Sequence, residues 1–102
     1  MTFPWISIYR IKGDSMIPIY YEGDFVILSG FPFTLNNLSV GDDIVFYHKI
    51  YSTLIKRIVQ LMKDDTIIVK GINSLSVSGN KLGPIQKSNV KGKVILHISK
   101  PT

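Results

Sequence analysis

The feature that most constrains the fold is that every apolar segment is short and is followed by turn-forming residues. Residues 5–12 alternate between apolar and polar side chains, and residues 25–28 form a brief apolar run. Period-two alternation with β-branched and aromatic residues is typical of strands. No segment carries a helical period over three turns. The pattern predicts an all-β fold with little helix, whose further strands cover residues 44–50, 53–61, 66–70 and 94–98.

Turn signals separate these segments. A tight connection near Tyr51 and Ser52 predicts a hairpin, and Asp64-Asp65 predicts the turn that follows it. Residues 29–40 and 71–89 are rich in Gly, Pro, Ser and Asn, so both are predicted to be loops. A chain of 102 residues suffices for one modest core, and residues 1–102 are therefore predicted to form a single domain.

The pair Gly-Asp occurs three times, at residues 13–14, 23–24 and 41–42. Glycine permits a positive φ, and aspartate accepts hydrogen bonds from nearby backbone amides, so the second and third copies are interpreted as turns. The first copy differs because Ser15 follows it directly.

Composition narrows the possible chemistry. The chain has no cysteine, and its two histidines, His48 and His97, lie far apart in sequence, so neither a metal site nor a cofactor is expected. The net charge is +5, but the basic residues do not cluster and no nucleic-acid motif accompanies them. No nucleic-acid partner is expected. A run of about 18 apolar residues, which a transmembrane helix needs, is absent from the sequence.

Without cysteine or paired histidines, a serine with a lysine base is the remaining nucleophile system. Lysine can act as a base only when burial lowers its pKa from about 10.4. Alternation along residues 53–61 places Lys56 on one face with Leu54 and Ile58. Taken alone, this pattern favours a lysine that extends to solvent, and it favours Ser15 as a helix N-cap.

Three ordered blocks resemble type I signal peptidases. Residues 11–26, IKGDSMIPIYYEGDFV, are similar to the nucleophile box of that family. Residues 41–61 resemble its Gly-Asp-Ile-Val strand and the hairpin that ends in Lys-Arg, with one extra Asp at position 43. Gly83-Pro84-Ile85 and Lys91-Gly92-Lys93-Val94 resemble the closing segment. The resemblance implies the all-β catalytic core of signal peptidases and LexA, built from coiled antiparallel sheets, in a soluble minimal form.

The resemblance also assigns roles. It makes Ser15 the nucleophile and Lys56 the general base, and it places the oxyanion hole in the nucleophile turn formed by Gly13, Asp14 and Ser15. Met16 and Pro18 would support this turn. The third block departs from the family because both Asp positions and the Arg are missing; the candidates for orienting the lysine are Ser76 and its rival Ser78.

Three functions follow as expectations. The first is a serine endopeptidase that processes an extended peptide or a signal or leader segment, with a protein or peptide substrate bound as an added strand. The second is a self-cleaving module of the LexA type, although only fourteen residues precede Ser15 and no helix-turn-helix is visible. The third is a catalytically inactive β-domain used for binding.

Peripheral membrane contact is a further expectation. Trp5, Phe31 and Phe33 are aromatic residues of the kind that anchor proteins at a membrane surface. The alternative is that Trp5 and one phenylalanine belong to the core. The sequence leaves the localisation open between the cytoplasm and the periphery of a membrane.

Overall fold

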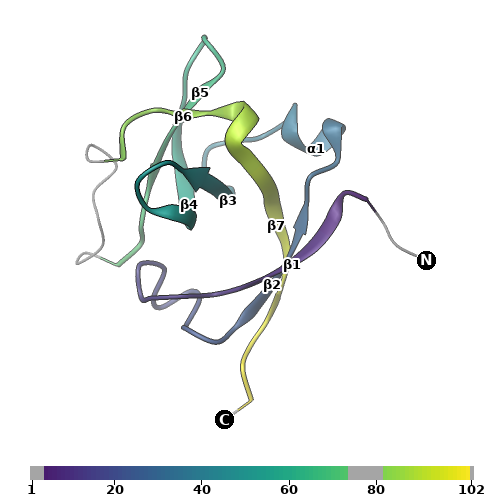
Figure 1. Ribbon diagram of the computed structural model, residues 1–102, viewed down its shortest axis with the longest axis vertical. Helices are drawn as coiled ribbons and strands as arrows, with labels where there is room; N and C mark the ends of the chain where they lie inside the picture. Colours follow the sequence, from purple (N-terminus) through teal and green to yellow (C-terminus); the bar gives the residue numbers. More distant parts are fainter. Residues whose placement is uncertain (1–3, 74–81, 102) are drawn as a thin grey trace.

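The fold is built on one antiparallel sheet, as seen in a computed structural model that describes residues 4–73 and 82–101 (Figure 1). Over these residues the sheet has seven strands in the order β1-β2-β7-β3-β4-β5-β6. The strands are β1 (Ile6–Arg10), β2 (Phe25–Ser29), β3 (Asp43–His48), β4 (Ser52–Leu61), β5 (Thr66–Lys70), β6 (Ile85–Gln86) and β7 (Val90–Ile98). The predicted all-β class is confirmed.

The predicted hairpins form at the predicted turns. β3 pairs with β4 from Asp43 opposite Arg57 to His48 opposite Ser52. Ser52 begins β4 with a φ of 65°, and Asp65 precedes β5 with a φ of 63°. Both turns require the left-handed region, which explains why polar residues with hydrogen-bonding side chains occupy them.

Both predicted loops contain structure. The segment 29–40 includes α1 (Pro32–Leu35), a single turn that begins with proline at a position where its missing N–H costs nothing. The segment 71–89 includes β6 and the 3₁₀ turn η1 (Lys87–Asn89). β7 begins four residues before the predicted strand. These elements escape prediction because two to four residues are too few for a period to emerge.

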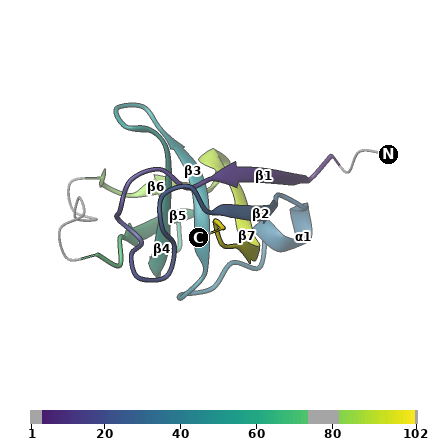
Figure 2. The ribbon, with the colours of Figure 1, turned by 90° about the horizontal axis from the view of Figure 1, so that it is seen from below.

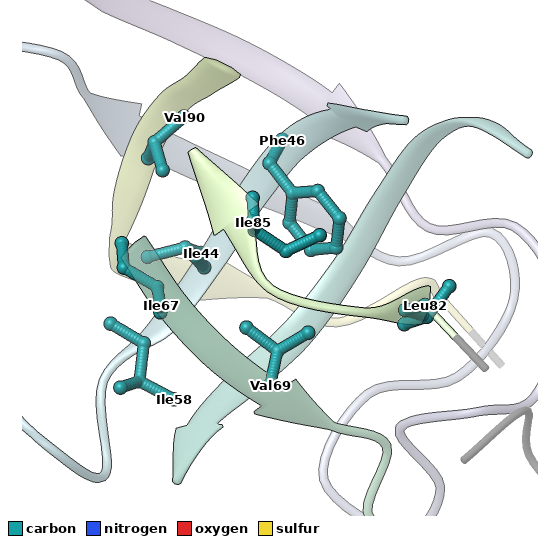
Figure 3. Close-up of a cluster of buried hydrophobic side chains, with 8 residues drawn as sticks. All are labelled: Ile44, Phe46, Ile58, Ile67, Val69, Leu82, Ile85 and Val90. Carbon is teal, nitrogen blue, oxygen red and sulfur yellow. The ribbon is translucent and has the colours of Figure 1, made fainter. Parts of the chain in front are cut away.

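Two apolar clusters hold the sheet together. The first lies among β3, β4, β5, β6 and the start of β7 (Figure 3) and comprises Ile44, Phe46, Ile58, Ile67, Val69, Leu82, Ile85 and Val90. The second joins β1, β2 and the segment between them to the opposite face of β3 and β4, and comprises Ile11, Met16, Tyr20, Val26, Leu28, Val45 and Ile55. β3 and β4 are therefore covered on both faces.

The second and third Gly-Asp pairs are turns, as predicted. Gly23 and Gly41 have φ values of 93° and 97°. Asp24 accepts a hydrogen bond from the amide of Tyr21, and Asp42 accepts one from the amide of Ser39. Each of these two pairs therefore forms the turn that leads into the next strand, β2 or β3.

Candidate active site

The connection from β1 to β2 carries Ser15. We call residues 13–20 the Ser15 turn. Gly13 opens it with a φ of 77°, and the carbonyl of Asp14 accepts a hydrogen bond from the amide of Ile17 at 3.2 Å. Successive turns follow from residue 15 to 19, and no helix begins here, so the N-cap interpretation of Ser15 is wrong. Ser15 is partly exposed, and its hydroxyl makes no hydrogen bond to another described residue.

Buried side chains fix the Ser15 turn to the second cluster. Met16 is 1% exposed and packs in the second cluster together with Tyr20. The peptide bond between Ile17 and Pro18 is cis. The buried side chain of Met16 holds the backbone next to Ser15, and the supporting roles of Met16 and Pro18 stay predictions.

Asn73, just after β5, holds the Ser15 turn from the other side. Its amide donates to the carbonyl of Ser15 at 2.8 Å, and its Nδ2 donates to the carbonyl of Asp14 at 2.9 Å. Asn73 was not among the residues predicted from the sequence, because no local pattern connects it to Asp14, 59 residues earlier in the chain.

Lys56 lies in the middle of β4 and is 3% exposed. It pairs with Ile44 of β3, and Ile58, its neighbour on the same face, belongs to the first cluster. The interpretation of Lys56 as a lysine that extends to solvent is therefore wrong. Burial lowers the pKa of the Lys56 amine below its ordinary value, because desolvation disfavours the ammonium form.

One carboxylate opposes the lowering of the Lys56 pKa by burial. Asp14, next to Ser15, interacts electrostatically with Lys56 and raises the pKa of its amine, but by less than burial lowers it. Within the described part of the chain, the salt bridges join other pairs and none includes Lys56. This electrostatic interaction connects the buried amine of Lys56 with the Ser15 turn, because Asp14 belongs to that turn. A lysine in this environment gives up its proton more readily than a surface lysine.

A buried carboxylate links the Ser15 turn to the strands that carry Lys56. Asp43, the extra Asp of the second block, is 8% exposed at the start of β3. Tyr20 donates its hydroxyl to Asp43 Oδ2 at 2.7 Å, and Arg57 donates from Nε and Nη2 at 2.7 and 3.1 Å. The hydrogen bonds to Asp43 raise the pKa of Arg57, and burial followed by the bond to Asp43 raises the pKa of Tyr20.

A groove of about 510 Å³ opens beside Ser15. One wall comes from the end of β1 and the Ser15 turn, and the other comes from the β3–β4 hairpin and the first residues of β4; the lining residues are Tyr9, Lys12, Gly13, Ser15, Tyr51, Ser52, Thr53, Leu54 and Ile55. Lys56 is not a lining residue; it follows Ile55, the last lining residue along β4. Its walls are backbone-rich strand and turn segments, which suits an extended ligand.

Both histidines have structural partners. His48 Nε2 lies 3.1 Å from the carbonyl of Leu82, and its Nδ1 accepts from the amides after β3. His97 Nε2 lies 2.7 Å from Asp24 Oδ2. Among the described residues, no group of three or more His, Asp or Glu side chains is arranged to hold a metal ion.

Ser76 and Ser78, the candidates for orienting Lys56, lie outside the described residues. Trp5, Phe31 and Phe33 are 47, 46 and 70% exposed, so the alternative that placed Trp5 and one of these phenylalanines in the core is wrong. The rings of Trp5 and Phe31 meet edge to face at 5.0 Å. No helix in the described ranges has the length and apolar character needed to cross a membrane.

Comparison with known proteins places this arrangement in a family. No curated protein matches the sequence. A family model described as Peptidase S24-like matches residues 6–95, a range that holds the Ser15 turn, the groove and Lys56. Because the match extends from β1 into β7 and covers most of the 102 residues, the chain belongs to the Peptidase S24-like family, within the superfamily of LexA-like and signal peptidase-like serine peptidases.

Proposed function

We propose that this chain is a serine endopeptidase in which Ser15 is the nucleophile and Lys56 the general base, acting on an extended peptide. The observation that carries the proposal is the burial of Lys56, whose amine has a lowered pKa and interacts with the residue next to Ser15. A buried, unbridged lysine costs stability, and such a cost is typical of a group kept for chemistry.

In the proposed reaction, neutral Lys56 takes the proton of Ser15 Oγ while this oxygen attacks the carbonyl carbon of the scissile peptide bond. The resulting ammonium gives the proton to the leaving amine, and an acyl group stays on Ser15. Water then attacks the acyl carbon as Lys56 accepts its proton. The bond between the acyl carbon and Ser15 Oγ breaks, Lys56 returns the proton to Oγ, and the second product leaves. Among the described residues, the amide of Ser15 makes no hydrogen bond, so it is free to donate to the developing oxyanion.

The substrate is proposed to bind as a strand. β1 stands at the end of the strand order and pairs with β2 on one side, so its other edge offers backbone groups to a ligand. β1 leads directly into the Ser15 turn, and its residue Tyr9 lines the groove. A peptide added to this edge would run toward Ser15, with backbone hydrogen bonds supplying affinity and the groove accepting side chains.

Covalent labelling tests the proposal. We expect a serine-reactive β-lactone to modify Ser15, as seen by intact mass and peptide mapping, and we expect Ser15→Ala and Lys56→Met to abolish the adduct. Ser88→Ala and Lys70→Met, at exposed positions distant in sequence, are the matched controls and keep full labelling. The labelling rate should rise with pH and level off below the ordinary lysine value, because the neutral amine is the active form.

The same samples separate the other functions. Incubation without substrate at alkaline pH, followed by intact mass, detects self-cleavage; fragments that Ser15→Ala abolishes would replace the proposal by the LexA-type module. A folded protein that takes no label at any pH would leave the inactive binding domain as the function.

A further inference from the structure

The strands β1, β2 and β7 expose an apolar surface on the side away from the second cluster. Tyr9 and Val26 pack into that cluster, so alternation turns their neighbours outward. The register then aligns two cross-strand rows, Ile8 with Ile27 and Leu96, and Arg10 with Phe25 and Ile98. We call this surface the apolar face; its members are Ile6, Ile8, Phe25, Ile27, Leu96 and Ile98.

Five of the six members of the apolar face are exposed, and Ile27 is partly exposed. Ile8 is 63% exposed and Leu96 is 56% exposed, although both lie within their strands. In an antiparallel sheet with one face on the core, the outer face normally carries polar side chains. A contiguous exposed apolar surface of this kind marks an interaction site.

The charges on these strands have one sign. The charged residues of β1, β2 and β7 are Arg10, Lys91 and Lys93, and these three strands contain no Asp or Glu. Arg10 lies in the second apolar row, and Lys91 and Lys93 lie near the opposite end. Lys93 Nζ lies 3.5 Å from Asp42 Oδ1, so Arg10 and Lys91 are the cations of these strands that form no salt bridge with a described residue. Asp24, the carboxylate next to β2, is 4% exposed and is bonded to His97 and the amide of Lys100.

Aromatic residues extend the surface at one end. α1 packs against β7, and Ser29 and Thr34 join it to β2 through a 3.0 Å hydrogen bond (Figure 2). The exposed Trp5–Phe31 pair and Phe33 lie at this end, just before β1 and in or beside α1. Exposed aromatic rings beside aliphatic and basic side chains are characteristic of proteins that bind at the headgroup boundary.

We propose that the apolar face docks on a lipid bilayer that carries anionic headgroups. The aliphatic rows enter the acyl boundary, and the basic residues at the two ends meet the headgroups. A second copy of this chain fits less well, because stacking two such faces brings cations toward cations. The proposal does not depend on the chemistry at Ser15.

Vesicle binding by the full chain tests the proposal. We expect co-sedimentation with vesicles of phosphatidylcholine and phosphatidylglycerol, weaker binding to phosphatidylcholine alone, and release by salt. The double variant Ile8→Ser/Leu96→Ser should bind at least tenfold more weakly. Arg10→Gln should bind about fivefold more weakly. The matched controls, Ile50→Ser and Lys70→Gln, change an exposed isoleucine and an exposed lysine elsewhere and should bind as the wild type does.

Four outcomes decide the proposal. Loss of binding in Ile8→Ser/Leu96→Ser, with an unchanged far-ultraviolet spectrum, supports it, as does weakened binding in Arg10→Gln, which remains informative if the double variant does not fold. Equal binding by the wild type and a folded double variant overturns it. Absence of vesicle binding together with a dimer that dissociates in the double variant, measured by sedimentation equilibrium, also overturns it and assigns the face to a second copy. Serine labelling in solution stays the same in the single variant Leu96→Ser, which changes β7 outside the proposed substrate edge, so failure here is distinct from failure of the peptidase proposal.

Discussion

Replacing Lys56 by methionine should stabilise the protein while it removes the proposed base. Lys56 is 3% exposed and makes no salt bridge to any described residue, so the folded state holds a desolvated amine that water would otherwise solvate. Methionine keeps an unbranched chain of similar length and therefore fills the same space on β4 without a charge.

Values measured for similar replacements in other proteins bound the expected increase in the free energy of unfolding. Replacement of a buried charged group by a well-packed apolar one is worth about 1–2 kcal/mol in the free energy of unfolding. The lost attraction to Asp14 works against this gain but is the smaller effect on the amine. For a chain of this size, the gain corresponds to a rise in Tm of roughly 5–15 °C.

The pH dependence of this stability gain tests whether desolvation of the Lys56 ammonium causes it. Because burial lowers the folded pKa of Lys56 below its unfolded value, the ammonium form destabilises the fold. The cost is fully present below the folded pKa and disappears as pH rises from that pKa toward the ordinary value of 10.5. The stability difference between Lys56→Met and wild type should therefore be constant below the folded pKa of Lys56 and should shrink as pH rises from that pKa toward 10.5.

Guanidinium unfolding at several pH values from neutral to alkaline measures this difference. Lys70→Met, which removes an exposed lysine from the adjacent strand, controls for the change in net charge and should leave stability nearly unchanged. A Lys56→Met variant that is less stable than wild type, or a gain that does not shrink with pH, would refute the reasoning.

Three further predictions concern the contacts around the site. Tyr20→Phe removes the donor to buried Asp43 and should lower the free energy of unfolding by about 1.5–3 kcal/mol, measured by urea unfolding. Asp24→Asn should make the free energy of unfolding less dependent on pH in acid. Hydrogen bonds from Lys100, Tyr21 and His97 hold the pKa of Asp24 at about 2 in the folded state. The stabilisation by Asp24 is therefore present above the pKa of the unfolded state and lost as pH falls toward 2. Asn73→Ala removes the bond to the carbonyl of Asp14 and should slow serine labelling roughly tenfold, measured with the β-lactone.

Each of these variants has a control or a contradicting result. Tyr21→Phe changes an exposed tyrosine and should be neutral in the same urea experiment. An Asp24→Asn protein with the wild-type acid transition would show that this carboxylate does not control acid unfolding. Equal labelling of wild type and Asn73→Ala would exclude Asn73 as a positioning residue, and a thermal melt separates slower labelling from partial unfolding.

The fold was predictable wherever an alternating pattern or a continuous apolar run extends over at least four residues between turn signals. β1, β2, β4 and β5 lie within a residue or two of the predicted bounds, and the turn residues at Ser52 and Asp65 mark the hairpins correctly. β6 was not predictable from local pattern, because its two residues are strand only through pairing with β5. α1 likewise depends on contacts with β7 rather than on an internal period.

The site was predictable only in part, and Lys56 shows why. Alternation placed it correctly with Leu54 and Ile58, but alternation cannot tell which face of a strand another element will cover. The cover comes from the first cluster, which includes Leu82 and Ile85 on segments more than twenty residues further along the chain. Asn73 is a similar case, since it meets the Ser15 turn across 59 residues of sequence. Local pattern therefore identifies candidate residues, whereas the topology that packs β4 between two clusters supplies the desolvation on which the proposed role of Lys56 depends.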